Sequence, residues 1–231
     1  SPAARGLFGK AILQSPYMVS TPSLKEARFG AAEATGLKLA KALGAADLIF
    51  CLDFNTPSRV KGLEAALRAA PQPKVLIDHH MFPEEAVFRY GVSEPDKSST
   101  CEMVYDFVML AGGDTEITPS LAACLYTGAM TDTGSFRFSA TTPSVHRMIA
   151  HLMERGVQHV RIHEEVYDSW SPSRMRFIGY VLIEKMQLFP KLNAGLIALS
   201  KKDLQLFNLG VGDTEGLVNY PLSVRGIRFS T

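Results

Sequence analysis

The sequence predicts an α/β protein with a mostly parallel sheet flanked by helices, followed by part of a smaller mixed α/β domain. Two short apolar runs, residues 48–52 and 74–77, enclose a helical stretch at residues 60–70. Strand, helix and strand at this spacing indicate a βαβ unit, whose strands are parallel and buried on both faces. Near residue 190 the sequence changes to short strand-like runs separated by turns, so we place the domains at residues 1–189 and 190–231.

The composition is that of a folded globular chain. Of the 231 residues, 46% are hydrophobic and 20% are charged, and 24 Lys and Arg against 23 Asp and Glu leave a net charge of +1. Without a basic block, extended duplex nucleic acid is not an expected partner, whereas a focused pocket could still hold a short anionic ligand. Three cysteines without CxxC spacing, no long apolar run and no leader-like start favour a cytoplasmic protein without a membrane span.

The remaining elements follow from helical periodicity and from the turn residues that interrupt it. A helix is expected at residues 24–43, where Gly44 supplies a C-cap, and another is expected to start near Pro119. The other predicted helices cover residues 98–110, 143–155, 160–167 and 175–187. Strand-like runs are predicted at residues 196–199, 217–218 and 227–229.

Carboxylates and imidazoles collect at the ends of these elements. Asp53 and Asp78 directly follow the two apolar runs, His79 and His80 come next, and Asp132 lies at the end of a predicted helix. The carboxyl ends of parallel strands share one edge of a sheet, so we expect these side chains to converge. Oxygen and imidazole ligands without thiolate suit Mn²⁺, Mg²⁺ or Fe²⁺, and two such ions would clamp a phosphoryl group. Any one of these residues alone is better explained as a helix cap or part of a solvated loop, and it is the set as a whole that indicates a site.

Three segments resemble ordered motifs of one family. Residues 75–80, which end in Asp-His-His, resemble the third motif of the DHH phosphoesterase superfamily. Residues 48–55 resemble its second motif and residues 131–136 its fourth. The superfamily includes single-strand exonucleases, inorganic pyrophosphatases and bacterial oligoribonuclease/pAp phosphatases, and residues 212–231 are similar to the last of these subgroups, the nanoRNase-like proteins.

The resemblance implies a role for each residue of the convergent set. Asp53 would bridge two metal ions, and His79 and Asp132 would bind one of them. His80 would act as a catalytic residue that contacts the substrate phosphate, and Asp78 would orient the histidine pair. A carboxylate behind an imidazole ligand suits this chemistry, because the ligand must be neutral and held in one tautomer.

The resemblance also implies contacts with the substrate. Ser98, Ser99 and Thr100, with Glu102 one turn later, are similar to a helix start that the family places near its site, where hydroxyl and N–H groups could hold a phosphate. Ordinary helix N-capping explains the same residues equally well. Arg137 is a further candidate for phosphate binding.

Two family motifs do not occur within these 231 residues. The first is an HxxPDGDA turn that supplies further metal ligands, and the second is a glycine-rich GGGH run in the small substrate domain. Residues 1–13 are similar to the helix that follows the HxxPDGDA turn, so we expect that turn upstream of Ser1. The final segment is then the early part of a DHHA1-like domain.

The function implied by the resemblance is Mn²⁺-dependent hydrolysis of phosphoesters, with Mg²⁺ as the alternative metal. The substrates would be short single-stranded oligonucleotides or 3′,5′-bisphosphate nucleotides such as pAp. Two alternatives stay open: a pyrophosphatase or exopolyphosphatase-like hydrolase, and a non-catalytic nucleotide-binding module if the first motif is absent. A homodimer is compatible with the sequence.

Overall fold

The computed structural model of the protein describes residues 46–209 and 212–231, and the chain divides into two compact units, Ser1–Ile162 and His163–Thr231. The helix expected at residues 24–43 and the segment 1–13 lie outside the described residues. No helix in the described part of the chain is both long and apolar enough to cross a membrane.

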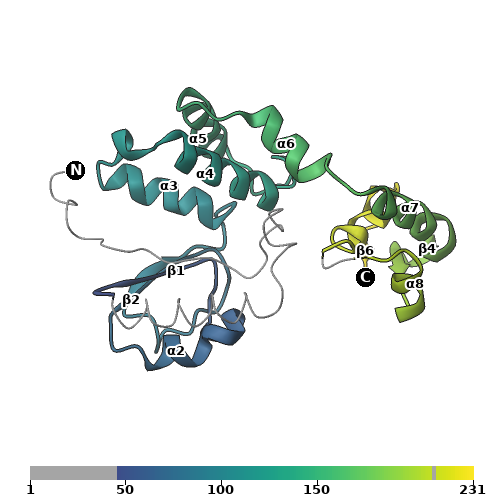
Figure 1. Ribbon diagram of the computed structural model, residues 1–231, viewed down its shortest axis with the longest axis horizontal. Helices are drawn as coiled ribbons and strands as arrows, with labels where there is room; N and C mark the ends of the chain where they lie inside the picture. Colours follow the sequence, from purple (N-terminus) through teal and green to yellow (C-terminus); the bar gives the residue numbers. More distant parts are fainter. Residues whose placement is uncertain (1–45, 210–211) are drawn as a thin grey trace. The chain divides into compact units, whose positions relative to one another are not determined.

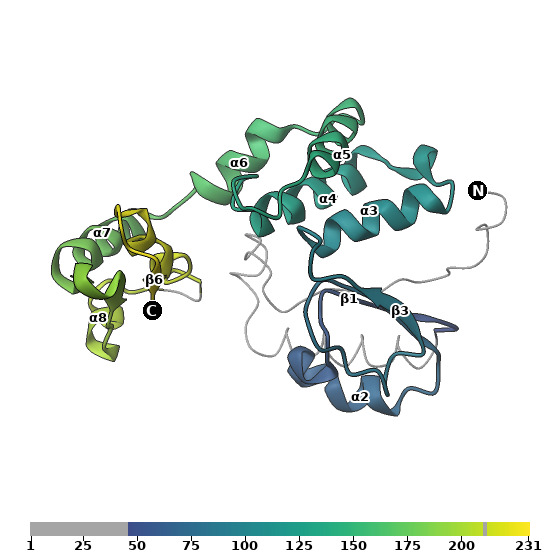
Figure 2. The same cartoon turned by 180° about the vertical axis from the view of Figure 1, so that it is seen from behind.

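The first unit contains a parallel sheet with helices on both of its sides. In chain order its described elements are β1 (Ile49–Leu52), the 3₁₀ helix η3 (Pro57–Leu63), α2 (Glu64–Ala69), β2 (Lys74–Asp78), β3 (Tyr90–Ser93), α3 (Thr100–Leu110), the 3₁₀ helix η4 (Asp114–Glu116), α4 (Pro119–Asp132) and α5 (Pro143–Glu154). The strands are parallel in the order β1-β2-β3. Helix α2 lies on one side of the sheet, and α3, α4 and α5 lie on the other (Figures 1 and 2). The predicted α/β class is therefore confirmed.

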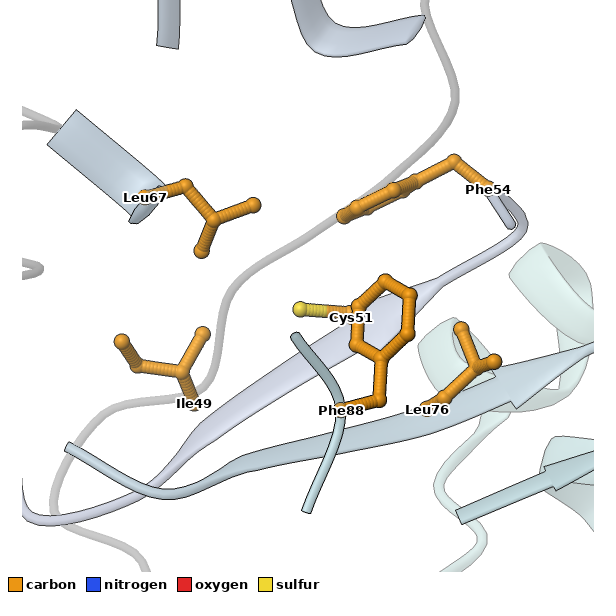
Figure 3. Close-up of a cluster of buried hydrophobic side chains, with 6 residues drawn as sticks. All are labelled: Ile49, Cys51, Phe54, Leu67, Leu76 and Phe88. Atoms are coloured by element: carbon orange, nitrogen blue, oxygen red, sulfur yellow. The ribbon is translucent and has the colours of Figure 1, made fainter. Parts of the chain in front are cut away.

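A hydrophobic cluster joins α2 to one face of this sheet. The cluster consists of the buried side chains of Ile49, Cys51, Phe54, Leu67, Leu76 and Phe88 (Figure 3). Successive residues of a strand point to opposite faces, so Phe50 lies on the other face and its ring lies 5.8 Å from that of Phe107 in α3. Each fully buried side chain of this kind contributes about 1.5–3 kcal/mol to stability. The sheet is thereby fixed between two helical layers.

The strand register brings the predicted site residues to one edge. Leu52 of β1 pairs with Ile77 of β2, and Asp53, the first residue after β1, donates its backbone N–H to the Ile77 carbonyl at 3.1 Å. Asp53 and Asp78 therefore leave the sheet side by side.

The second unit is smaller and has a mixed sheet. In chain order the remaining elements are α6 (His159–Tyr167), which crosses the division between the units, α7 (Pro172–Tyr180), the π-helical turn η5 (Val181–Lys185), β4 (Met186–Phe189), the 3₁₀ helix η6 (Pro190–Leu192), β5 (Ala194–Ile197), α8 (Lys201–Leu206), the 3₁₀ helices η7 (Leu217–Asn219) and η8 (Pro221–Ser223), and β6 (Phe229–Ser230). Strand β5 pairs antiparallel with β4 and parallel with β6. The core of this unit contains the buried Phe177, Ile178, Val181 and Leu217.

Several predicted elements differ from the structure. The helix predicted at residues 175–187 ends as α7 at Tyr180, and the chain passes through the π-helical turn into β4, because pairing with β5 overrides the helical pattern. The strand predicted at residues 217–218 is the 3₁₀ helix η7, which begins after Gly216 with a left-handed φ of 80°. Strand β3 was not predicted, since its four residues include a glycine. The second compact unit begins at His163 and includes α7, which shares a core with Leu217. The domain boundary between residues 189 and 190 stays a prediction.

Candidate metal centre

The candidate site is built by the two loops that follow β1 and β2. Asp53 adopts a left-handed conformation with a φ of 66°, which turns the chain out of β1. An asparagine two residues later joins the loops: Asn55 Nδ2 donates to the Met81 carbonyl at 2.7 Å, and the Asn55 carbonyl accepts from the Glu84 N–H at 2.8 Å. These bonds hold the Asp53 loop against the loop that carries His79 and His80.

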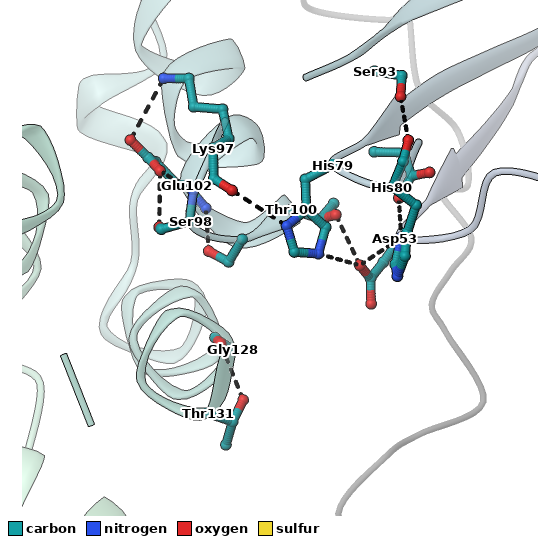
Figure 4. A network of polar contacts seen from close by, with 12 residues as sticks. Asp53, His79, His80, Ser93, Lys97, Ser98, Thr100, Glu102, Gly128 and Thr131 are labelled. Atoms are coloured by element: carbon teal, nitrogen blue, oxygen red, sulfur yellow. Dashed lines mark hydrogen bonds and ion pairs between the residues drawn. The ribbon is translucent and has the colours of Figure 1, made fainter. Parts of the chain in front are cut away.

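Asp53, His79 and His80 form a compact cluster of ligand atoms. One potential ligand atom from each lies within 4.8 Å of the others. The His79 Nε2 atom is 3.6 Å from Asp53 Oδ1, and the His80 Nδ1 atom is 3.9 Å from the same oxygen (Figure 4). Two ligands that each lie about 2.1 Å from one ion are at most about 4 Å apart. Asp53 and His79 are therefore spaced to hold one divalent ion between them.

The hydrogen bond on the far side of His79 selects its tautomer. His79 Nδ1 lies 3.3 Å from the backbone carbonyl oxygen of Lys97. A carbonyl oxygen can only accept a hydrogen bond, so Nδ1 carries the proton and Nε2 of the neutral ring has a free lone pair. That lone pair is on the atom that lies near Asp53, as a metal ligand requires.

Two further polar side chains support the cluster. Asp78 is completely buried, and its Oδ1 accepts from His80 Nδ1 at 2.7 Å. Within the described residues no partner reaches the buried Oδ2 of Asp78. Thr100, the first residue of α3, donates its hydroxyl to Asp53 Oδ1 at 2.9 Å. That Asp78 orients the histidine pair stays a prediction, and within the described residues its side chain bonds to His80.

Asp132 lies at the end of α4 and is outside the compact cluster. Its side chain keeps a solvent-exposed face, but the atoms packed around the carboxylate and the nearby charge of Asp53 raise its pKa to about 6. His79 and His80 act in the opposite direction and lower the pKa of Asp132. A carboxylate that is costly to ionise beside a second carboxylate is one that a cation would stabilise.

The predicted substrate-binding residues divide into two groups. Ser98 and Ser99 are buried, and both hydroxyls bond to Glu102: Ser98 Oγ donates to its carboxylate at 2.8 Å, and Ser99 Oγ accepts from its backbone N–H as the N-cap of α3. Thr100 contacts the cluster through Asp53. Arg137 is exposed and donates Nε to the Gly134 carbonyl at 2.7 Å. Substrate binding by these residues stays a prediction.

The predicted site residues omit three groups that bond to the cluster, to its loops or to Glu102 behind it. They are the carbonyl of Lys97, the side chain of Asn55 and the hydroxyl of Ser144, which donates to the Glu102 carboxylate at 2.9 Å. Asn55 lies in the segment that resembles the second motif, which is the only signal for it. The contact through Lys97 uses the backbone, so its side chain gives no indication.

A parallel sheet with Asp53, His79 and His80 clustered at its carboxyl edge defines an α/β protein with a candidate metal centre. The model of the DHH family, N-terminal domain, matches residues 7–129, which is more than half of the chain, and the protein belongs to this family.

Similar proteins agree with this assignment. The bifunctional oligoribonuclease and PAP phosphatase NrnA of Thermus thermophilus is 36% identical over 58% of this chain and 39% of its own length. A probable protein of the same name from Streptococcus mutans is 29% identical over 64% of this chain and 46% of its own length. The chain thus spans less than half of these relatives. The crystal structure of an exopolyphosphatase-related protein from Bacteroides fragilis has a TM-score of 0.82 and 35% identity, covering 90% of this chain and 60% of that one.

Proposed function

We propose that the protein is a metal-dependent phosphoesterase that hydrolyses short oligonucleotides or 3′,5′-bisphosphate nucleotides and uses Mn²⁺. The observation that carries the proposal is the convergence of Asp53, His79 and His80, with ligand atoms within 4.8 Å of one another at the carboxyl edge of a parallel sheet. The names of the two NrnA relatives support this substrate class.

Each residue of the cluster has a role that its contacts support. Asp53 and His79 would hold a metal ion, and Asp132 at the end of α4 would be a further carboxylate ligand. Bound divalent ions would polarise the phosphoryl group and activate the attacking water. His80 is oriented by Asp78 through Nδ1, which leaves its Nε2 atom to contact the substrate phosphate.

We propose that the C-terminal segment, residues 190–231, binds the substrate. The strands β5 and β6, which pair in parallel, lie within residues 190–231, the segment proposed to belong to a DHHA1-like domain. A cytoplasmic setting agrees with the three free cysteines, all of which lie in the described part of the chain.

The test compares hydrolysis of pAp, a dinucleotide and pyrophosphate by the protein with added Mn²⁺. The Asp53→Asn variant is expected to lose more than about 100-fold in turnover, because it removes a charged ligand rather than only a residue behind one. The matched control is Asp47→Asn, an exposed carboxylate before the opposite end of β1, which is expected to keep wild-type turnover. If the wild-type protein cleaves none of the three substrates, the proposal is contradicted and a nucleotide-binding module is favoured.

A second candidate is an exopolyphosphatase-like hydrolase. The similarity to the exopolyphosphatase-related protein of Bacteroides fragilis favours it. Faster turnover of pyrophosphate or polyphosphate than of pAp and the dinucleotide would select this candidate. Both candidates use the same metal centre, so only the substrate comparison separates them.

A further inference from the structure

The peptide group between Lys97 and Ser98 is hydrogen-bonded at both of its ends. Its carbonyl oxygen accepts from Nδ1 of His79 at 3.3 Å, and its N–H donates to Oε2 of Glu102 at 2.9 Å (Figure 4). A peptide group is planar and rigid, so the positions of these two partners are linked. Glu102 is thereby connected to a candidate metal ligand that it does not touch.

Glu102 is a buried hub of polar contacts, and only 3% of it is exposed. Its carboxylate accepts from the hydroxyls of Ser98 at 2.8 Å and Ser144 at 2.9 Å, and Lys97 Nζ lies 3.5 Å away. Burial alone raises the pKa of Glu102, but the hydrogen bonds from Ser98 and Ser144 and the charge of Lys97 outweigh it and hold that pKa below its ordinary value. Glu102 is therefore a buried anion at neutral pH.

Helix capping does not account for this arrangement. Ser99 already caps α3, because its hydroxyl accepts from the Glu102 N–H at 3.1 Å. In a capping box the side chain at this position bonds to the N–H of the cap residue. Here the carboxylate bonds instead to the preceding residue, Ser98, and also to Ser144 at the start of α5. The Glu102 carboxylate is therefore placed to hold the Lys97–Ser98 peptide, whose carbonyl faces His79, rather than to cap the helix.

A charged acceptor on the N–H has an electrostatic consequence for the carbonyl. Charge-assisted hydrogen bonds are stronger than neutral ones, and hydrogen bonds in a chain polarise one another. The Glu102 carboxylate therefore makes the Lys97 carbonyl a better acceptor for the His79 Nδ1–H. Such support behind a histidine fixes its tautomer and raises the basicity of its other nitrogen.

The same segment also orients the second candidate ligand. Thr100 follows Lys97 by three residues and donates its hydroxyl to Asp53 Oδ1 at 2.9 Å. Fixing the turn at residues 97–100 therefore fixes one partner of His79 and one partner of Asp53. Both partners depend on how Glu102 holds Ser98.

We propose that Glu102 is a positioning residue of the metal centre, which acts through the Lys97–Ser98 peptide to hold His79 in the tautomer with an unprotonated Nε2. The part of this inference that concerns metal affinity rests on the proposed function. The tautomer of His79 is a property of the metal-free protein and is independent of it.

The experiment replaces Glu102 with glutamine, which keeps the shape but has only one oxygen. The amide can accept either from Ser98 or from Ser144, and it carries no charge. The ring-nitrogen chemical shifts of isotope-labelled histidine, assigned with a His79→Gln variant, report the tautomer in metal-free protein above the histidine titration range. We expect the Nδ1–H form of His79 in the wild type and a shift toward the Nε2–H form in Glu102→Gln. Mn²⁺ affinity, measured by electron paramagnetic resonance, is expected to fall about tenfold.

Two control variants separate positioning from stability. Thr118→Ala removes the N-cap of α4 at the end opposite Asp132, about 20 Å away along the helix, and costs about 1 kcal/mol of stability. Asp106→Asn removes the closer carboxylate partner of Lys97, at 2.7 Å. Both controls are expected to keep the wild-type tautomer and Mn²⁺ affinity.

Ser144→Ala provides a second test if Glu102→Gln does not fold. It removes one donor to the carboxylate from a different helix and is expected to shift both readouts in the same direction by less. The inference would be overturned if His79 kept the wild-type tautomer in whichever of Glu102→Gln and Ser144→Ala folds. It would also be overturned if Thr118→Ala shifted the tautomer as much as these variants do. Wild-type protein that binds no Mn²⁺ would contradict the proposed function, and the tautomer comparison would still decide the role of Glu102.

Discussion

Replacing Asp132 with asparagine is expected to stabilise the metal-free protein at neutral pH. The carboxylate of Asp132 is packed among other atoms and lies close enough to Asp53 for its charge to be unfavourable. Asparagine has nearly the same shape and no charge, so the substitution removes this electrostatic cost. Asp132, a candidate metal ligand, is therefore expected to lower the free energy of unfolding of the protein until a cation is bound.

The magnitude and its pH dependence follow from the pKa of about 6, against an ordinary value of 3.8. This difference corresponds to at most ~3 kcal/mol, and solvent screening of the exposed face of Asp132 reduces it to about 1 kcal/mol. The folded state binds more protons than the unfolded state between about pH 4 and 6, so the free energy of unfolding falls as the pH rises through this window. The advantage of Asp132→Asn is therefore complete above about pH 6 and disappears below about pH 4.

The assay is urea unfolding followed by circular dichroism, with a metal chelator present, at several pH values from about 4 to 7.5. The exposed Asp47→Asn variant is the control and is expected to change stability by less than about 0.5 kcal/mol. Adding Mn²⁺ is expected to stabilise the wild type more than Asp132→Asn. A variant that is less stable than the wild type at neutral pH without metal would refute the reasoning, as would a gain that is equally large near pH 4.

Two further substitutions test the packing behind the site. Asn55→Ala removes the bond from Nδ2 to the loop after β2 and is expected to cost about 1 kcal/mol in urea unfolding and to weaken Mn²⁺ binding; unchanged stability and affinity would contradict the proposed link between the loops. Gly128→Ala places a Cβ against the sulfur of Cys101 between α4 and α3, with an expected cost of about 1–3 kcal/mol. Adding Cys101→Ala to Gly128→Ala is expected to restore part of this loss, because it removes the sulfur that the new Cβ meets. Strictly additive effects of the two substitutions would show that the two residues do not clash.

Local sequence patterns predicted the elements that carry the site. The apolar run before Asp53 is β1, the run that ends at Asp78 is β2, and the cap pattern at Ser99 begins α3. Short apolar runs and N-capping are local properties, so they can be read from a few neighbouring residues. The convergence of Asp53 with His79 follows from parallel pairing, which the βαβ spacing indicates.

Contacts between distant segments were not predictable in the same way. The bond from His79 to the Lys97 carbonyl spans 18 residues, and that from Ser144 to Glu102 spans 42. Neither contact depends on a residue type that is distinctive at its position, and one uses only the backbone. The predicted helix 175–187 runs two residues into β4 for a related reason, because pairing of β4 with β5 outweighs the local pattern.

The central claim is that Asp53 and His79 hold a divalent ion together, with His79 Nε2 as the donor atom. Pulsed electron paramagnetic resonance of Mn²⁺ bound to the protein detects a directly coordinated imidazole nitrogen. The account predicts a nitrogen coupling in the wild type that His79→Gln abolishes and His80→Gln retains. Mn²⁺ bound without nitrogen coupling, or a coupling that survives in His79→Gln, would contradict it.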